Sequence, residues 1–251
     1  MKLKRILITG DDGYNSVGTR TLAHLLKKKY EVNIAATLRQ QSGTGGKISL
    51  TNNIPWGEEK VEGVSALWVD GSPADAIEVA QGYFKKPFDF VISGINYGEN
   101  VGYSLVSSGT FSAAVRAIGV QLAPKAIVLS WQTTANNFFI KHKVKDDLSS
   151  FLKYPGEMAI KLIEKCINNN CYGKELVNIN FPNTPTDKVR IVKPARDITR
   201  LWKYPLDIDK KRKFAHQPKE TYSRNLETEV ETDVGALHKG HITITPLNYL
   251  S

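Results

Sequence analysis

The alternation of short apolar runs with helical patterns along the first half of the chain is the strongest constraint on its fold. Arg5–Thr9 and Ala126–Trp131 are nearly continuous apolar runs, which are typical of parallel strands buried on both faces. Similar strand signals cover residues 31–36 and 88–93, and another strand ends at residues 68–70. Short connections between such strands and helices favour a parallel sheet with helical crossovers.

Helical patterns fall between the predicted strands. Residues 19–29 carry leucines at helical spacing. Ser72 followed by Pro73 is typical of a helix N-cap and the first helical position. The remaining predicted helices cover residues 112–118 and 157–168.

Two more strands are predicted beyond the alternating part, at residues 176–181 and 241–245. We therefore expect an α/β fold with a doubly wound, mostly parallel sheet and helices on both faces, followed by a C-terminal β-rich extension or oligomerisation arm. Residues 1–251 are expected to form a single domain, with a Rossmann-like core at 1–135 and the arm at about 185–240.

Composition excludes several classes of protein. A chain of 251 residues, 41% of them hydrophobic, can bury a sizeable core without disulfides or metals. No apolar stretch approaches the ~20 residues of a membrane span, and no secretory signal core is found, so we expect a cytoplasmic protein. The net charge of +9 favours phosphate-bearing partners without identifying one. Cys166 and Cys171 match no zinc or redox spacing.

Polar, glycine-rich segments follow the predicted strands, at the edge where open parallel sheets bind ligands. These segments are residues 10–13, 41–46, 93–100 and 107–110. The adjacent carboxylates of Asp11 and Asp12 suit a hard divalent cation such as Mg²⁺, Mn²⁺ or Ca²⁺. An ordinary Asx-type turn also explains this pair when it is taken alone, and the convergence of four polar segments favours the metal site.

Two of these segments have further binding chemistry. Asn96 and Asn100 lie among glycines, which let the backbone approach a ligand, and a carboxamide oxygen is a suitable metal ligand. Ser108, Gly109 and Thr110 begin a predicted helix, and the free N–H groups of a helix N-terminus bind phosphate. A simple helix cap is the alternative for this last segment.

Several familiar motifs are absent. Residues 41–48 lack the first glycine and the final Ser/Thr of a Walker loop, and residues 43–46 lack the spacing of a dinucleotide site. No Gly-x-Ser-x-Gly elbow is present, which argues against a serine α/β-hydrolase. The sequence therefore supports neither a P-loop ATPase nor a Rossmann dehydrogenase.

Taken in order, the motifs resemble those of the SurE (survival protein E) family, metal-dependent phosphatases that act on nucleoside monophosphates. The residues that carry the resemblance are 9–13, 41–43, 69–75, 93–102, 108–110, 232–233 and 243–247. Asp-Asp-Gly, Gly-Ile-Asn and Ser-Gly-Thr in this order are specific to the family, although each alone would be weak evidence.

The resemblance implies a phosphomonoesterase that hydrolyses nucleoside 5′-monophosphates to nucleoside and phosphate and forms a homodimer or homotetramer. It implies one divalent cation per subunit, Mg²⁺ or Mn²⁺, with the ligands Asp11, Asp12, Ser42 and Asn96. It implies phosphate or substrate contacts from Gly43, Asn100, Ser108, Gly109 and Thr110. Catalysis is assigned to Asp11 and Asp12.

The chain departs from the family pattern at five positions outside the expected metal ligands: Gly10, Leu38, Lys47, Ser107 and Arg116. Residues around a metal site can change affinity or activity by roughly 10–100-fold, so these departures bear on rate more than on reaction class. The alternative is a catalytically weakened nucleotide-binding or regulatory protein on the same fold. Neither nucleic acid nor a membrane is an expected partner.

Overall fold

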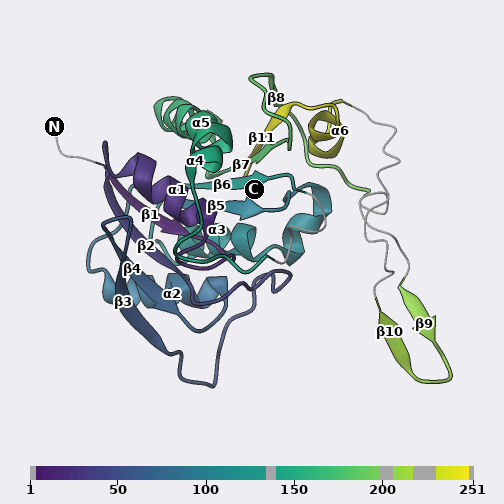
Figure 1. Cartoon of the computed structure of the whole chain (residues 1–251), viewed down its shortest axis with the longest axis horizontal. Coiled ribbons are helices and arrows are strands. Elements are labelled where there is room, and N and C mark those ends of the chain that lie inside the picture. The colour runs from purple at the N-terminus through teal and green to yellow at the C-terminus, as the bar shows by residue number, and fades with distance from the viewer. Residues whose placement is uncertain (1–3, 134–139, 198–205, 217–229, 249–251) are drawn as a thin grey trace.

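The computed structural model describes residues 4–133, 140–197, 206–216 and 230–248 (Figure 1). The strands of its main sheet are β1 (Arg5–Thr9), β2 (Glu31–Thr37), β3 (Trp56–Val61), β4 (Val64–Val69), β5 (Phe90–Tyr97), β6 (Ala126–Trp131), β7 (Leu176–Phe181), β8 (Val189–Ile191) and β11 (Ile242–Leu247). They are ordered β3-β4-β2-β1-β5-β6-β7-β11-β8. Neighbouring strands from β4 to β7 are parallel, whereas β3 and β11 pair antiparallel with β4 and β7. The predicted doubly wound, mostly parallel sheet is confirmed.

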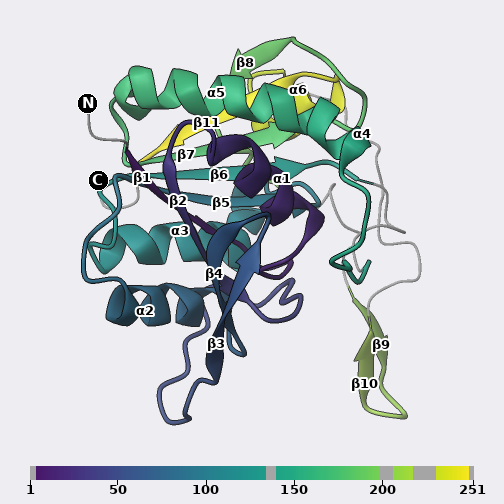
Figure 2. The same cartoon turned by 60° about the vertical axis from the view of Figure 1, so that its left-hand side comes forward.

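Helices cover both faces of the sheet. The main ones are α1 (Val17–Leu26), α2 (Pro73–Tyr83), α3 (Gly109–Gly119), α5 (Glu157–Asn168) and α6 (Asp233–His238), with short turns α4 (Ser149–Phe151), η1 (Gly102–Ser107), η3 (Leu152–Gly156) and η4 (Asn170–Gly173). Figure 2 shows α1 and α5 on one face and α2 and α3 on the other. Side chains of β1 alternate accordingly: Ile6 and Ile8 pack with the α1 and α5 core, and Leu7 packs with the α2 and α3 core. No helix in the described residues is long and apolar enough to cross a membrane.

Three serines begin the helices that border the sheet edge. Ser16, Ser72 and Ser108 cap α1, α2 and α3, each through a side-chain oxygen that accepts a backbone N–H three residues later. Gly18 in α1 has no room for a side chain, because a Cβ atom would lie 1.9 Å from the carbonyl oxygen of Ile95. The absence of a Cβ therefore lets α1 lie directly against β5.

Most elements agree with the sequence-based prediction, with informative differences. The strand predicted at residues 88–93 continues to Tyr97 with a register shift between Ser93 and Asn96, which carries Asn96 to the end of the strand. The first helix ends at Leu26 rather than at residue 29. Strand β3 was not predicted, because its sequence is charged and largely exposed at the edge of the sheet.

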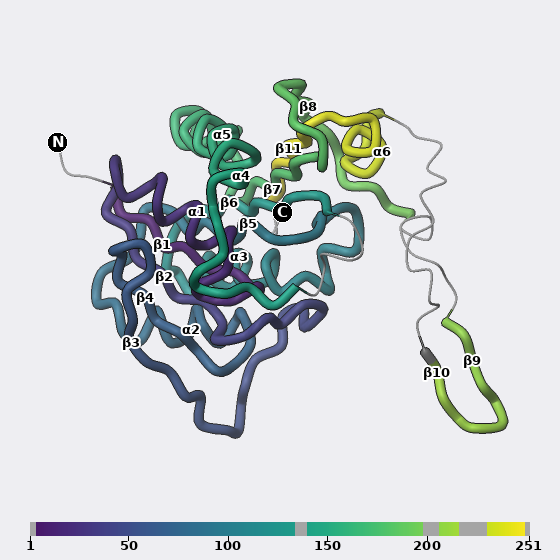
Figure 3. Tube along the Cα trace, viewed as in Figure 1, coloured from purple at the N-terminus to yellow at the C-terminus, as the bar shows by residue number. Residues whose placement is uncertain are grey.

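The C-terminal part returns to the sheet beside β7, as the chain trace in Figure 3 shows for α6 and β11. Within residues 185–240, β8 joins the main sheet, and β9 (Asp207–Asp209) and β10 (Phe214–His216) form a separate antiparallel hairpin. Residues 198–205 and 217–229 of the expected arm lie outside the described residues. The β-rich character predicted for this segment agrees with the strands that are described.

Candidate metal and phosphate site

A small recess lies at the carboxyl ends of β1 and β5, where α3 begins. Its lining residues are Gly10, Asp11, Asp12, Ser16, Thr19, Gly94, Ile95, Asn96 and Thr110. Asp11 and Asp12 are buried, with 4% and 8% of their surface exposed. Three of the four predicted metal ligands and one predicted phosphate contact therefore meet at one place, as expected for an open parallel sheet.

The hydroxyl group of Thr110 lies between two of the predicted ligands. It hydrogen-bonds with Asp11 Oδ1, and its oxygen lies 3.1 Å from Asn96 Oδ1. Asn96 Nδ2 donates to the carbonyl of Gly98 at 2.8 Å, which turns the oxygen of the carboxamide toward Thr110 and Asp11. The arrangement presents carboxylate, hydroxyl and carboxamide oxygens together, which is a hard donor set.

Asp12 is held by groups that the sequence did not single out. Its Oδ2 accepts the backbone N–H of Tyr97 at 2.8 Å, and its Oδ1 accepts Gln40 Nε2 at 3.2 Å. The ring of Tyr97 stacks on Phe151 with centroids 5.2 Å apart and meets Trp131 edge-on at 5.3 Å. This aromatic packing fixes the backbone donor that orients Asp12.

The two carboxyl groups destabilise each other's charge. Burial raises the pKa of Asp11, although hydrogen bonds from Thr110 and from backbone groups at Gly109 and Thr110 act in the opposite direction. Burial, and then the negative charge of Asp11, raise the pKa of Asp12. No Lys or Arg in the described residues forms an ion pair with either group. A divalent cation fits this site because it would neutralise both charges.

Gly109 brings the N-terminus of α3 against the acidic pair. A Cβ atom at this position would lie 2.8 Å from Asp11 Oδ2 and 2.8 Å from Pro73 Cγ. Only glycine permits this approach, which places the positive end of the α3 dipole beside Asp11.

For the phosphate-releasing reaction that the sequence resemblance implies, we expect Gly109→Ala to lower kcat/KM by roughly 10–100-fold. The new methyl group must displace the Asp11 carboxylate or α3 itself. Gly119→Ala is the matched control, since it lies in the same helix with nothing within 4 Å of a Cβ atom. Steady-state kinetics of both variants test the prediction. Equal activities would show that the close approach is unimportant.

The segment that carries Ser42 and Gly43 lies beside the recess. The backbone N–H of Gln41 donates to the carbonyl of Asp11 at 2.7 Å. Ser42 and Gly43 are exposed, and Ser42 does not line the recess. The end of the loop is fixed by Asp75, which accepts the backbone N–H of Ser49 at 2.8 Å. The structure therefore places Ser42 near the acidic pair but not in contact with it.

Two other predicted contacts have structural partners. Ser108 Oγ accepts the N–H of Phe111 at 3.1 Å, which is the helix-cap role left open above. Asn100 lies beyond the recess and bonds through Nδ2 to Ser130 Oγ at 2.8 Å. Of the departures from the family pattern, Lys47 is exposed, and Arg116 forms an ion pair with Glu78 that links α3 to α2.

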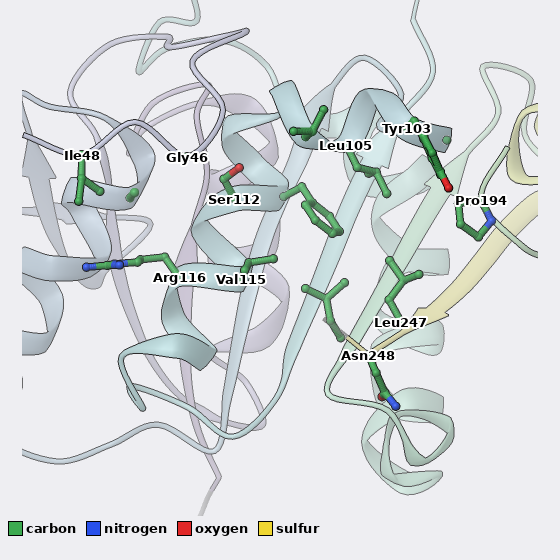
Figure 4. A pocket seen from close by; sticks show the side chains of 15 residues that line it. Gly46, Ile48, Tyr103, Leu105, Ser112, Val115, Arg116, Pro194, Leu247 and Asn248 are labelled. Atoms are coloured by element: carbon green, nitrogen blue, oxygen red, sulfur yellow. The ribbon is translucent and has the colours of Figure 1, made fainter. Parts of the chain in front are cut away.

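A larger cavity of about 640 Å³ lies elsewhere, lined by residues of α3, η1 and the ends of β7 and β11 (Figure 4). Its lining is mainly apolar and includes Leu105, Phe111 and Val115, and none of the recess residues contributes to it. The acidic site is therefore distinct from this cavity.

The fold and the site together define a doubly wound α/β protein with a buried acidic site at the carboxyl edge of its parallel strands and a helix N-terminus against it. The family model described as "Survival protein SurE" matches residues 6–204. The chain belongs to this family.

Individual relatives support the same assignment along nearly the whole chain. A protein named 5′-nucleotidase SurE from Carboxydothermus hydrogenoformans is 32% identical, with 98% of this chain and 90% of the relative covered. A protein of the same name from Clostridium tetani is 32% identical, with coverages of 98% and 94%. The crystal structure of the Sure protein from Aquifex aeolicus superposes with a TM-score of 0.76 at 25% identity, covering 98% of this chain and 94% of that one.

Proposed function

We propose that this protein is a divalent-metal-dependent phosphomonoesterase that hydrolyses nucleoside 5′-monophosphates to nucleoside and phosphate. The observation that carries the proposal is the meeting of Asp11, Asp12 and Asn96 with the N-terminus of α3. A cation site beside the positive end of a helix dipole suits a phosphate ester. The relatives named 5′-nucleotidase support the same activity.

The proposed ligands of one Mg²⁺ or Mn²⁺ are Asp11, Asp12, Ser42 and Asn96. The bound cation would supply positive charge to phosphate oxygens and lower the pKa of bound water. We propose phosphate or substrate contacts from Gly43, Asn100, Ser108, Gly109 and Thr110 at this end of the site. One of the two aspartates would act as base or nucleophile.

A phosphate-release screen over nucleoside monophosphates tests the proposal directly. We expect release with Mg²⁺ or Mn²⁺ and none with a chelator. Tight nucleotide binding without release would instead identify a catalytically weakened nucleotide-binding protein. Release that persists at full rate in the chelator would contradict the metal site.

We also propose that the protein is a cytoplasmic homodimer or homotetramer, and that residues 185–240 contribute the arm of a single domain. The β9–β10 hairpin supports a role of the arm in assembly, because its apolar side chains Ile208 and Phe214 are 60% and 67% exposed. Light scattering of wild type and of an Ile208→Lys, Phe214→Lys double variant would measure the contribution of the hairpin to assembly.

Thr110→Val should weaken metal binding by about 10-fold, because it removes the hydroxyl group that donates to Asp11 and lies 3.1 Å from Asn96 Oδ1. Titration calorimetry with Mn²⁺ measures this change. Thr21→Val is the matched control, since Thr21 is buried and its hydroxyl has no partner in the described part of the chain. An unchanged metal affinity with reduced kcat would assign Thr110 to the phosphate alone.

A further inference from the structure

Residues 98–102 lie beside the carboxyl ends of β6 and β7, and the N–H groups of every second residue in this segment are bonded. The donors are the backbone N–H groups of Gly98, Asn100 and Gly102, at 2.9, 2.9 and 2.7 Å from their acceptors. The acceptors are, in the same order, the carbonyl of Trp131, the side chain of Asn180 and the side chain of Asp233. The middle of the segment is thus held by a side chain rather than by a neighbouring backbone.

Asn180 binds both backbone polar groups of Asn100. Its Oδ1 accepts the N–H of Asn100 at 2.9 Å, and its Nδ2 donates to the carbonyl of the same residue at 2.9 Å. Asn178, two residues earlier on β7, donates to that carbonyl at 2.8 Å. Both asparagines are fully buried. Their carboxamides bind residue 100 as a neighbouring strand would, because Asn100 has no backbone hydrogen-bond partner within the described ranges of the chain.

The side chain of Asn100 is fixed at the same time. Its Nδ2 donates to Ser130 Oγ at 2.8 Å, and Ser130 is the register partner of Asn180 across β6 and β7. A carboxamide nitrogen carries two hydrogens, so one donor of Asn100 remains for another acceptor. Backbone and side chain together give this residue a single orientation.

We infer that Asn180, assisted by Asn178, is a positioning residue of the reaction that acts through Asn100. This inference rests on the proposed function, in which Asn100 contacts the substrate phosphate. A buried carboxamide is costly unless it is hydrogen-bonded, and an aliphatic residue would fill the same strand position without this demand. The hydrogen bonds of the Asn180 side chain go to Asn100, and Asn178 Oδ1 has no partner in the described part of the chain.

A double-mutant cycle with Asn180→Ala and Asn100→Ala tests the inference. We expect Asn180→Ala to lower kcat/KM by about 10–100-fold, since small displacements of a positioned group have effects of this size. In the Asn100→Ala background the same substitution should cause less than about a 3-fold further loss, because residues that act as a unit are not additive. Metal affinity should stay within about 3-fold, because Asn96 bonds to Gly98, which is itself held by the carbonyl of Trp131 and not by Asn180.

Thr243→Val is the matched control. Thr243 pairs with Asn180 in the sheet register, is fully buried, and has a hydroxyl without a partner in the described residues, so the kinetics of this variant should stay near wild type. If Asn180→Ala does not fold, Asn178→Ala replaces it in the cycle, with an expected loss of about 3–10-fold that disappears in the Asn100→Ala background.

Each outcome of the cycle decides a separate point. Losses that multiply in the double variant, or wild-type kinetics of the Asn180 or substitute Asn178 variant, would overturn the positioning role while leaving the proposed function intact. Wild-type kinetics of Asn100→Ala would show that Asn100 does not contact the substrate, and would overturn both the inference and that part of the proposed function. Absence of metal-dependent phosphate release from the wild-type protein would overturn the proposed function itself.

Discussion

Asp11→Asn should abolish phosphate release, by at least about 1,000-fold, and yet make the metal-free protein more stable. The loss of activity is expected because a neutral carboxamide replaces the charge of a proposed metal ligand, and Ser42 and Asn96 cannot supply that charge. The gain in stability follows from burial, since Asp11 lies beside Asp12 and no described Lys or Arg pairs with either carboxylate.

The size of the gain follows from the charge that is removed. Replacing one member of a buried like-charged pair by an isosteric neutral group should raise the free energy of unfolding by about 1–3 kcal/mol near pH 8. Chemical denaturation in the presence of a chelator measures this change. A protein whose active site is strained by its own charges commonly gains stability when that function is removed.

Asp75→Asn is the matched control with the opposite expected sign. Burial alone would raise the pKa of Asp75, but hydrogen bonds from Ser49 and Ser72 outweigh it and lower the pKa. The charged form of Asp75 is therefore the stabilised one, and its loss should reduce stability. If Asp11→Asn destabilised the metal-free protein as Asp75→Asn does, the view that burial of the Asp11 charge outweighs its hydrogen bonds would be wrong.

The core strands of this fold could be predicted from the sequence because burial on both faces requires nearly continuous runs of apolar residues. Runs such as Ala126–Trp131 and Leu176–Phe181 are buried along their length, so hydrophobicity alone locates them. Strand β3 has mainly exposed and charged residues, and its pairing with β4 depends on backbone hydrogen bonds that any sequence can make. Such an edge strand leaves little signal in one sequence.

The sequence anticipated which candidate residues lie together where they follow strands, but it did not anticipate the side chains that hold Asn100. Asp11 follows β1, Asn96 lies near the end of β5, and Thr110 lies at the start of α3. The topology of a parallel sheet brings these three positions together. Asn178 and Asn180 lie inside a predicted strand that reads as buried core. Only the strand order shows that they reach residue 100, although two asparagines two apart in an apolar run are a signal of a polar partner.

The metal-free protein should lose stability as the pH rises from about 4 to about 8. Burial and the adjacent Asp11 raise the pKa of Asp12 to about 8 from the usual 3.8, and burial raises the pKa of Asp11 as well. Between these values the native state binds more protons than the unfolded state, so the free energy of unfolding falls with rising pH. Because the pKa of Asp75 is lowered, the effect of its titration on stability falls below about pH 4, outside this pH range.

Addition of Mg²⁺ should reverse this loss, and the reversal should itself depend on pH. At pH 8 the cation binds the ionised pair, and saturation at about 100 times the Kd would add about 2.7 kcal/mol. At pH 5 protons compete for the same carboxylates, so the increase in Tm should be much smaller. Calorimetric scans at both pH values, with Mg²⁺ or chelator, measure the difference. Equal increases at pH 5 and pH 8, or an undiminished increase in Asp11→Asn, would mean that the cation binds elsewhere. A site made of carboxyl groups with raised pKa values must couple metal binding to proton release in this pH range.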